Sequence, residues 1–138
     1  MIIKLRERVK PVKTPESIHH LILNILKEEH EVDRQKEHFW SIGLNSKNKI
    51  KYIEMVSLGI LNASLVHPRE LFRLAISRAA ASIIVAHNHP SGDPEPSEED
   101  ISMTKRIVES GKILGIEVLD HVIVCSRQYK SFKELGHM

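Results

Sequence analysis

Two histidines that follow an apolar run are the residues best suited to chemistry in this sequence. His87 and His89 come directly after residues 82–86, a short apolar and β-branched run that is typical of a buried central strand. If the extended conformation continues to His89, strand alternation places both imidazoles on one face, and Pro90 favours that conformation. Two imidazoles side by side at a strand end supply two of the three protein ligands of a catalytic zinc ion.

An acidic residue at the start of the next predicted helix offers a third ligand. Prolines at positions 90, 94 and 96 stiffen the loop after the histidines, and Ser97 begins a helix that carries Asp100 in its first turn. Asp100 can supply an oxygen ligand and leave a fourth position for water. The same residues also form a capping pattern, in which Ser97 caps the helix and the acid complements the helix dipole. The two interpretations are compatible, and both stay open at this point.

The elements that must position these residues follow from hydrophobic periodicity and turn signals. We predict a helix from Thr14 to about Glu31, with His19 and His20 at its surface, and a second helix that opens at His67. The other predicted elements are a hairpin over residues 39–44 and 50–56, an ambiguous strand or loop over 59–66, strands over 82–86 and 116–125, a helix from Ser97 and a possible edge strand over 129–132. Strands mixed with helices around a buried run indicate an α/β (mixed α+β) domain. Residues 1–13 are predicted to be an arm or short strand, and residues 14–138 one domain.

Composition narrows the classes of function. The chain has 138 residues with 20 Lys and Arg against 18 Asp and Glu, so it offers no broad cationic surface for nucleic acid. The basic surplus between Lys4 and Lys13 is interpreted as a solvated arm or a charged edge strand rather than a phosphate contact. No apolar run approaches the length of a membrane helix, and the first residues do not resemble a secretory signal. With Cys125 as its one cysteine, the chain is expected in the reducing cytoplasm.

The motif that these residues form resembles a known family. His87, His89, Ser97 and Asp100 match the H-x-H-x7-S-x2-D signature of JAMM (MPN-type) metallopeptidases. More narrowly, residues 67–70 (HPRE), 87–94 (HNHPSGDP) and 119–121 (LDH) look like the RadC branch, and the resemblance runs from about residue 14 to 136. It implies a curved mixed sheet flanked by helices, JAMM/MPN-like with a cytidine-deaminase-like layering. It also implies that His87, His89 and Asp100 bind Zn²⁺ and that Ser97 forms hydrogen bonds near the reacting oxygen.

The resemblance further implies an acidic general base on an early strand, for which the sequence offers three candidates. Glu37 lies at the entry to the first predicted strand, where JAMM proteins carry theirs. Glu54 lies in the middle of a hairpin strand and can simply face solvent. Glu70 follows the start of a helix, where an acid that complements the dipole is explanation enough. We therefore expect Glu37 to be the base.

The function expected from this motif is zinc-dependent hydrolysis of a peptide or isopeptide amide bond in a peptide or protein substrate. One alternative is a DNA-repair or DNA-processing factor, an association that the RadC resemblance carries, with the metal site cutting phosphodiesters. Another is a non-catalytic binding module, although structural zinc usually has four protein ligands and only three are in view. An apolar edge at residues 2–5 would suit strand pairing in a homo-oligomer.

The remaining polar candidates are expected to be structural. His121 follows Asp120 in a predicted strand, where neighbouring side chains point to opposite faces, so direct pairing of the two is not expected. We predict that His121 supports the fold, while the family resemblance keeps a functional role open. Cys125 is expected to behave as a small hydrophobic residue, and Trp40 to lie in the core.

Overall fold

The computed structural model describes residues 1–3, 14–59 and 66–138. The predicted arm of residues 1–13 falls mostly outside these ranges, as does most of the segment 59–66. The elements are α1 (Pro15–Lys27), α2 (Glu31–Arg34), β1 (Glu37–Leu44), β2 (Ile50–Gly59), α3 (Pro68–Ser77), β3 (Ser82–Asn88), α4 (Glu98–Leu114), β4 (Glu117–Val124) and β5 (Tyr129–Ser131). Among the described helices, none has the length and apolar content that crossing a bilayer needs.

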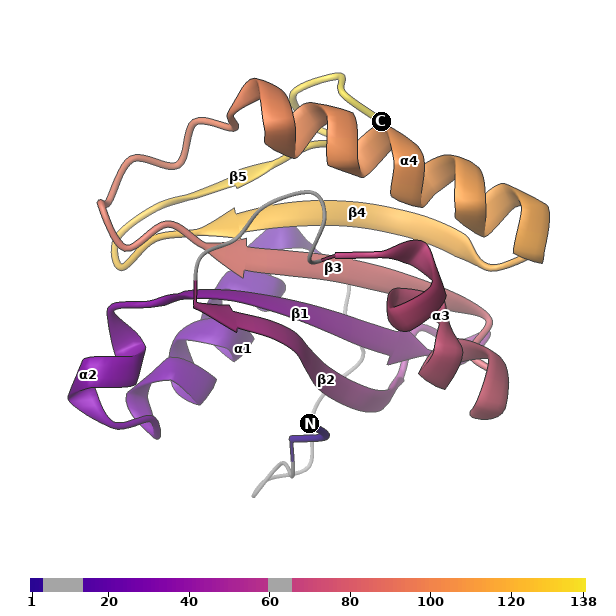
Figure 1. Cartoon of the computed structure of the whole chain (residues 1–138), viewed down its shortest axis with the longest axis horizontal. Coiled ribbons are helices and arrows are strands. Elements are labelled where there is room, and N and C mark those ends of the chain that lie inside the picture. Colours follow the sequence, from indigo (N-terminus) through magenta and orange to yellow (C-terminus); the bar gives the residue numbers. More distant parts are fainter. Residues whose placement is uncertain (4–13, 60–65) are drawn as a thin grey trace.

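A five-stranded mixed sheet forms the centre of the molecule, in the order β2-β1-β3-β4-β5 (Figure 1). β1 pairs antiparallel with both β2 and β3, whereas β3 and β4 are parallel and α4 connects them. Every residue of β3 is buried, which confirms the central strand predicted from its apolar composition. The predicted hairpin and the mixed α/β class are also confirmed.

Helices cover both faces of this sheet. α1 lies on one face and packs against side chains such as Trp40, Ile84 and Ala86, while α3 and α4 lie on the other with Phe39 and Val85 (Figure 1). Side chains alternate along β3, so the even-numbered positions face α1 and the odd-numbered ones face α4. This alternation continues to the end of the strand and decides where its polar residues point.

Helix α1 differs from the sequence prediction at its end and on one face. Thr14 caps it with a reciprocal capping box and Pro15 occupies its first turn, as expected. The helix stops at Lys27 rather than near Glu31, because the chain turns and His30 caps the separate short helix α2. The prediction that His19 lies at the surface was wrong. Its ring is buried against the sheet, with Nε2 2.7 Å from the carbonyl oxygen of Cys125.

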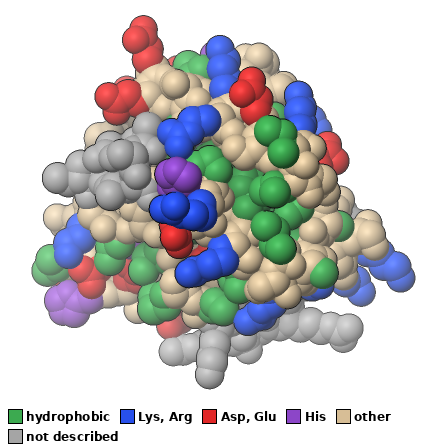
Figure 2. Space-filling model, turned by 45° about the vertical axis from the view of Figure 1, so that its right-hand side comes forward, with side chains coloured by type: hydrophobic (Ala, Val, Ile, Leu, Met, Phe, Trp, Pro, Cys, Tyr) green, Lys and Arg blue, Asp and Glu red, His purple; other side chains and the backbone are tan. Residues whose placement is uncertain are grey.

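The side of the molecule that carries α3 and the C-terminal end of α4 is partly apolar. Helix α3 opens at His67 as predicted; the structure adds that the His67 side chain caps the helix, and Phe72 is among its buried residues. Ile76 remains 58% exposed, because only one narrow face of this short helix packs against the core. Figure 2 shows hydrophobic side chains gathered on this side with Lys and Arg side chains around them. The carboxyl end of β3 points away from it (Figure 1).

One buried tyrosine makes the stability of the fold sensitive to alkali. Tyr52 of β2 lies opposite Gly43 of β1, where a Cβ atom would collide with its ring. Burial raises the pKa of Tyr52 from 10.0 to about 12. A pKa raised in the folded state adds stability that is fully present below pH 10 and is lost as pH rises toward 12. We expect the free energy of unfolding to fall by about 2 to 3 kcal/mol across this window.

Urea unfolding of the wild type and Tyr52→Phe at pH 8, 10, 11 and 12 measures this loss. Other groups titrate in both proteins, so we expect the free energy of unfolding to fall more steeply with pH in the wild type than in Tyr52→Phe. Equal dependence on pH in the two proteins would show that Tyr52 does not cause the loss of stability.

Candidate metal centre

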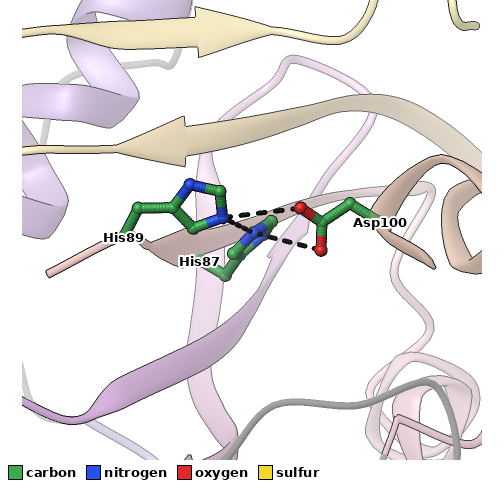
Figure 3. A group of neighbouring side chains, drawn as sticks. All are labelled: His87, His89 and Asp100. Carbon is green, nitrogen blue, oxygen red and sulfur yellow. Dashed lines mark hydrogen bonds and ion pairs between the residues drawn. The ribbon is translucent and has the colours of Figure 1, made fainter. Parts of the chain in front are cut away.

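Three side chains from two elements meet at the carboxyl end of β3 (Figure 3). His87 and His89 extend from the strand end toward α4, and Asp100 reaches them from the first turn of that helix. His87 Nε2 lies 2.9 Å from His89 Nε2 and 3.6 Å from Asp100 Oδ1, and His89 Nε2 lies 3.4 Å from Asp100 Oδ2. One ligand atom from each residue lies within 4.8 Å of the other two, so a single ion can contact all three. Within residues 1–3, 14–59 and 66–138, no other group of three or more His, Cys, Asp or Glu side chains lies close enough together to share an ion.

Helix capping holds the carboxylate in place. The backbone N–H of Ser97 donates to Asp100 Oδ2 at 2.9 Å, and the N–H of Asp100 donates to the Ser97 hydroxyl at 3.0 Å. Asp100 therefore closes a capping box and also faces both imidazoles, so both interpretations of this residue hold. The Ser97 hydroxyl accepts a hydrogen bond here and keeps its own proton to donate elsewhere.

A chain of buried hydrogen bonds fixes the tautomer of His87. The Thr104 hydroxyl donates its only proton to the carbonyl oxygen of Asp100, at 2.7 Å. It must then accept from His121 Nδ1, which lies 2.6 Å away, so His121 Nε2 carries a lone pair. That lone pair accepts from His87 Nδ1, also at 2.6 Å. In neutral His87 the lone pair on Nε2 consequently points at His89 and Asp100, as metal binding requires.

The loop after β3 fixes the tautomer of His89 through a hydrogen bond to its own backbone. His89 Nδ1 lies 2.8 Å from the carbonyl oxygen of Asp93, to which it can only donate. The neutral ring therefore also carries its lone pair on Nε2. The backbone N–H of His89 donates to the carbonyl of Val124 at 3.0 Å, which ties the residue to β4.

The electrostatics of the cluster favour positive charge at its centre. Burial alone would raise the pKa of Asp100, but the imidazoles of His87 and His89 beside its carboxylate outweigh burial and hold that pKa well below its usual range. Burial lowers the pKa of His87, whereas the adjacent carboxylate of Asp100 raises the pKa of His89. Burial also lowers the pKa of His121 well below 6.5, which keeps its ring neutral. An ionised carboxylate beside two imidazole lone pairs is a donor set suited to a divalent cation.

The three candidate general bases lie in different surroundings. Phe39 pairs with His87 across β1 and β3, so Glu37, two residues earlier, lies on the same face as the histidines. Its charge is felt at both rings, although burial dominates and lowers the pKa of His87, and Asp100 is the main cause of the raised pKa of His89. Glu54 is half-buried on β2, where burial raises its pKa, and Glu70 is exposed on α3 with Arg73 3.8 Å away.

Sequence reasoning missed the supporting residues of this cluster. His121 was predicted to support the fold, but its ring lies directly behind His87, and Thr104 lies behind His121. The spacing of Asp100 and Thr104, one helical turn apart, was the one local signal available. Asp120 points away from the cluster and accepts a hydrogen bond from Ser131 at 2.6 Å, so the expected lack of a side-chain pair between Asp120 and His121 is confirmed.

Thr104 offers a test of this support through two conservative variants. Thr104→Val keeps the shape but leaves His121 without an acceptor, so His87 loses its fixed tautomer. We expect zinc affinity to fall by about 10- to 100-fold, the usual effect of losing such an outer partner. Thr104→Ser keeps the hydroxyl and should retain wild-type affinity. Competition with a chelating dye measures both, and equal affinities of the two variants would contradict the hydrogen-bond chain.

The fold and the cluster together define an α/β domain with a candidate metal centre of two histidines and one aspartate. The RadC-like JAB domain matches residues 12–137, and the chain belongs to this family. It is 55% identical over 126 residues to a UPF0758 protein of Caldanaerobacter subterraneus, covering 91% of this chain and 52% of that relative. It is 49% identical over 125 residues to a UPF0758 protein of Desulforamulus reducens, covering 91% and 53%. The chain thus spans about half the length of these curated relatives.

Proposed function

We propose that this chain is a zinc-dependent hydrolase of the JAMM type that cleaves a peptide or isopeptide amide bond. The observation that carries the proposal is the meeting of His87, His89 and Asp100 with their lone pairs directed at one point. Two imidazoles and a carboxylate are a common ligand set of catalytic zinc, and three protein ligands leave a position for substrate. Family membership supports the same conclusion.

The roles of the surrounding residues follow from this placement. A zinc ion bound there supplies a Lewis acid that polarises a carbonyl and lowers the pKa of water. Glu37 takes the proton of the attacking water and returns it to the leaving amine. Ser97, whose hydroxyl proton is free to donate, stabilises the oxygen of the attacked carbonyl. His121 and Thr104 act through His87, whose orientation they fix.

The substrate is proposed at the level of its chemistry, since the chain spans about half of its relatives. An amide in a peptide or protein is favoured over a phosphodiester because the formal charge of +2 gives little attraction for nucleic acid. The single cysteine is compatible with action in a reducing cytoplasm.

The test compares zinc-loaded and chelated protein on peptide and isopeptide libraries and, in parallel, on branched and single-stranded DNA. Zinc-dependent amide cleavage that is lost in His89→Ala supports the proposal. Nuclease activity that is lost in the same variant, without amide cleavage, would replace it with the DNA-processing alternative. Stoichiometric zinc without either activity would favour the non-catalytic binding module.

A further inference from the structure

Asn88, the last residue of β3, lies between the two candidate histidine ligands, but its side chain points the opposite way. Strand alternation directs its side chain to the α1 side of the sheet, where it is only 4% exposed. Asn88 Oδ1 accepts a hydrogen bond from the backbone N–H of His38 at 2.6 Å, and Nδ2 donates to the carbonyl oxygen of Lys36 at 3.0 Å. These two backbone groups stand on either side of Glu37.

The side-chain amide takes over where the backbone ladder stops. The pairing of β1 with β3 ends at Phe39 opposite His87. Beyond that pair, the side chain of Asn88 contacts the backbone N–H of His38, and Glu37 and His89 are the next residues of the two segments. The ladder does not reach these positions, and the two bonds of Asn88 hold this part of the chain to β3 instead. The ring of His38 fixes the same segment locally, with Nδ1 2.7 Å from the Lys36 carbonyl oxygen and Nε2 2.6 Å from Glu29 Oε2.

We propose that Asn88 is a positioning residue that sets Glu37 against His87 and His89. The proposal rests on the proposed function, in which Glu37 is the base. Asn88 is bonded in sequence to both histidines and bonded through its amide to both flanks of Glu37, so one residue joins the ligand strand to the base. An amide suits the task because it offers one acceptor and one donor together, whereas a carboxylate would oppose the Lys36 carbonyl.

Two variants separate the two hydrogen bonds. Asn88→Asp keeps the acceptor for the His38 N–H but loses the donor to Lys36, and Asn88→Ala loses both. We expect kcat to fall by about 10-fold in the first and about 100-fold in the second, because small misplacements of a catalytic group cost this much. KM and zinc stoichiometry should stay near wild type. Ser82→Ala, at the other end of β3, is the matched control for general weakening of the strand and should leave kcat unchanged.

A double-mutant cycle distinguishes positioning from a merely structural role. If Asn88 acts through Glu37, Asn88→Ala causes no further loss of kcat in a Glu37→Gln background. Losses that multiply, or Asn88 variants as fast as wild type, would overturn the inference while the proposed function stands.

Measurements that need no substrate can test the role of Asn88 independently of the proposed hydrolase activity. Amide hydrogen exchange at His38 should accelerate in Asn88→Ala and much less in Asn88→Asp. The visible absorption of the Co²⁺-substituted protein, which responds to groups around the open coordination position, should change alike in Asn88→Ala and Glu37→Gln and no further in the double variant. If the wild type cleaves no amide but these effects appear, the inference stands and the proposed function falls. Unchanged exchange and spectra would overturn the inference.

Discussion

Alanine in place of His89 is expected to abolish stoichiometric zinc binding. Removing one of three protein ligands leaves two, and we expect affinity to fall by more than about 100-fold, beyond the effect of outer-shell residues. Elemental analysis of purified protein and competition with a chelating dye measure the loss. His89 is the cleaner position because its side chain is 17% exposed, whereas His87 is wholly enclosed and also serves as the donor to His121.

The control for this experiment is another histidine. His20 is exposed on α1, with 69% of its side chain accessible and Glu16 3.7 Å away, so His20→Ala should bind zinc like the wild type. His87→Ala should lose zinc as His89→Ala does. Full occupancy in both ligand variants would mean that the ion binds elsewhere, and the site would be rejected.

Glutamine in place of Glu37 is expected to remove most of the hydrolytic rate while zinc stays bound. Glutamine keeps the size of the side chain but cannot take a proton, and a positioned general base contributes about 10²- to 10⁴-fold. The measurement is kcat on the best substrate from the libraries, together with zinc content. A fall in rate with loss of zinc would point instead to a role in holding the metal.

The other two early carboxylates serve as controls for the choice of base. Glu54 lies on β2, one strand further from β3, and Glu70 is exposed on α3. Glu54→Gln and Glu70→Gln should therefore keep rates within a few-fold of wild type. A loss in Glu54→Gln that equals the expected loss in Glu37→Gln would transfer the role to that residue.

Sequence patterns predicted the candidate ligands because local rules place each of them. Alternation along a strand orients His87 and His89, and capping of a helix orients Asp100. The proline-rich loop then needs only to bring the start of α4 near the end of β3. These are short-range constraints, which spacing in the sequence records directly.

The supporting residues could not be predicted because their contacts depend on strand register. His121 meets His87 only because β3 and β4 are parallel, with a register shift between Ile83 and Ile84. The burial of His19 likewise depends on which face of the sheet α1 covers. The role of Asn88 likewise could not be predicted, because it depends on hydrogen bonds to the backbone of residues 36 and 38, which lie far from it in the sequence.

The place of His87 on the innermost strand has a thermodynamic consequence. His87 cannot release an ion through fraying of its strand, since β3 pairs with β1 and with β4 as far as His87. Release of the metal by local opening is therefore costly, and free energy gained from the ion accrues to the cooperative unfolding of the whole domain. We expect such a centre to exchange its ion slowly, at a rate tied to unfolding of the whole domain, although it lies at the end of a strand.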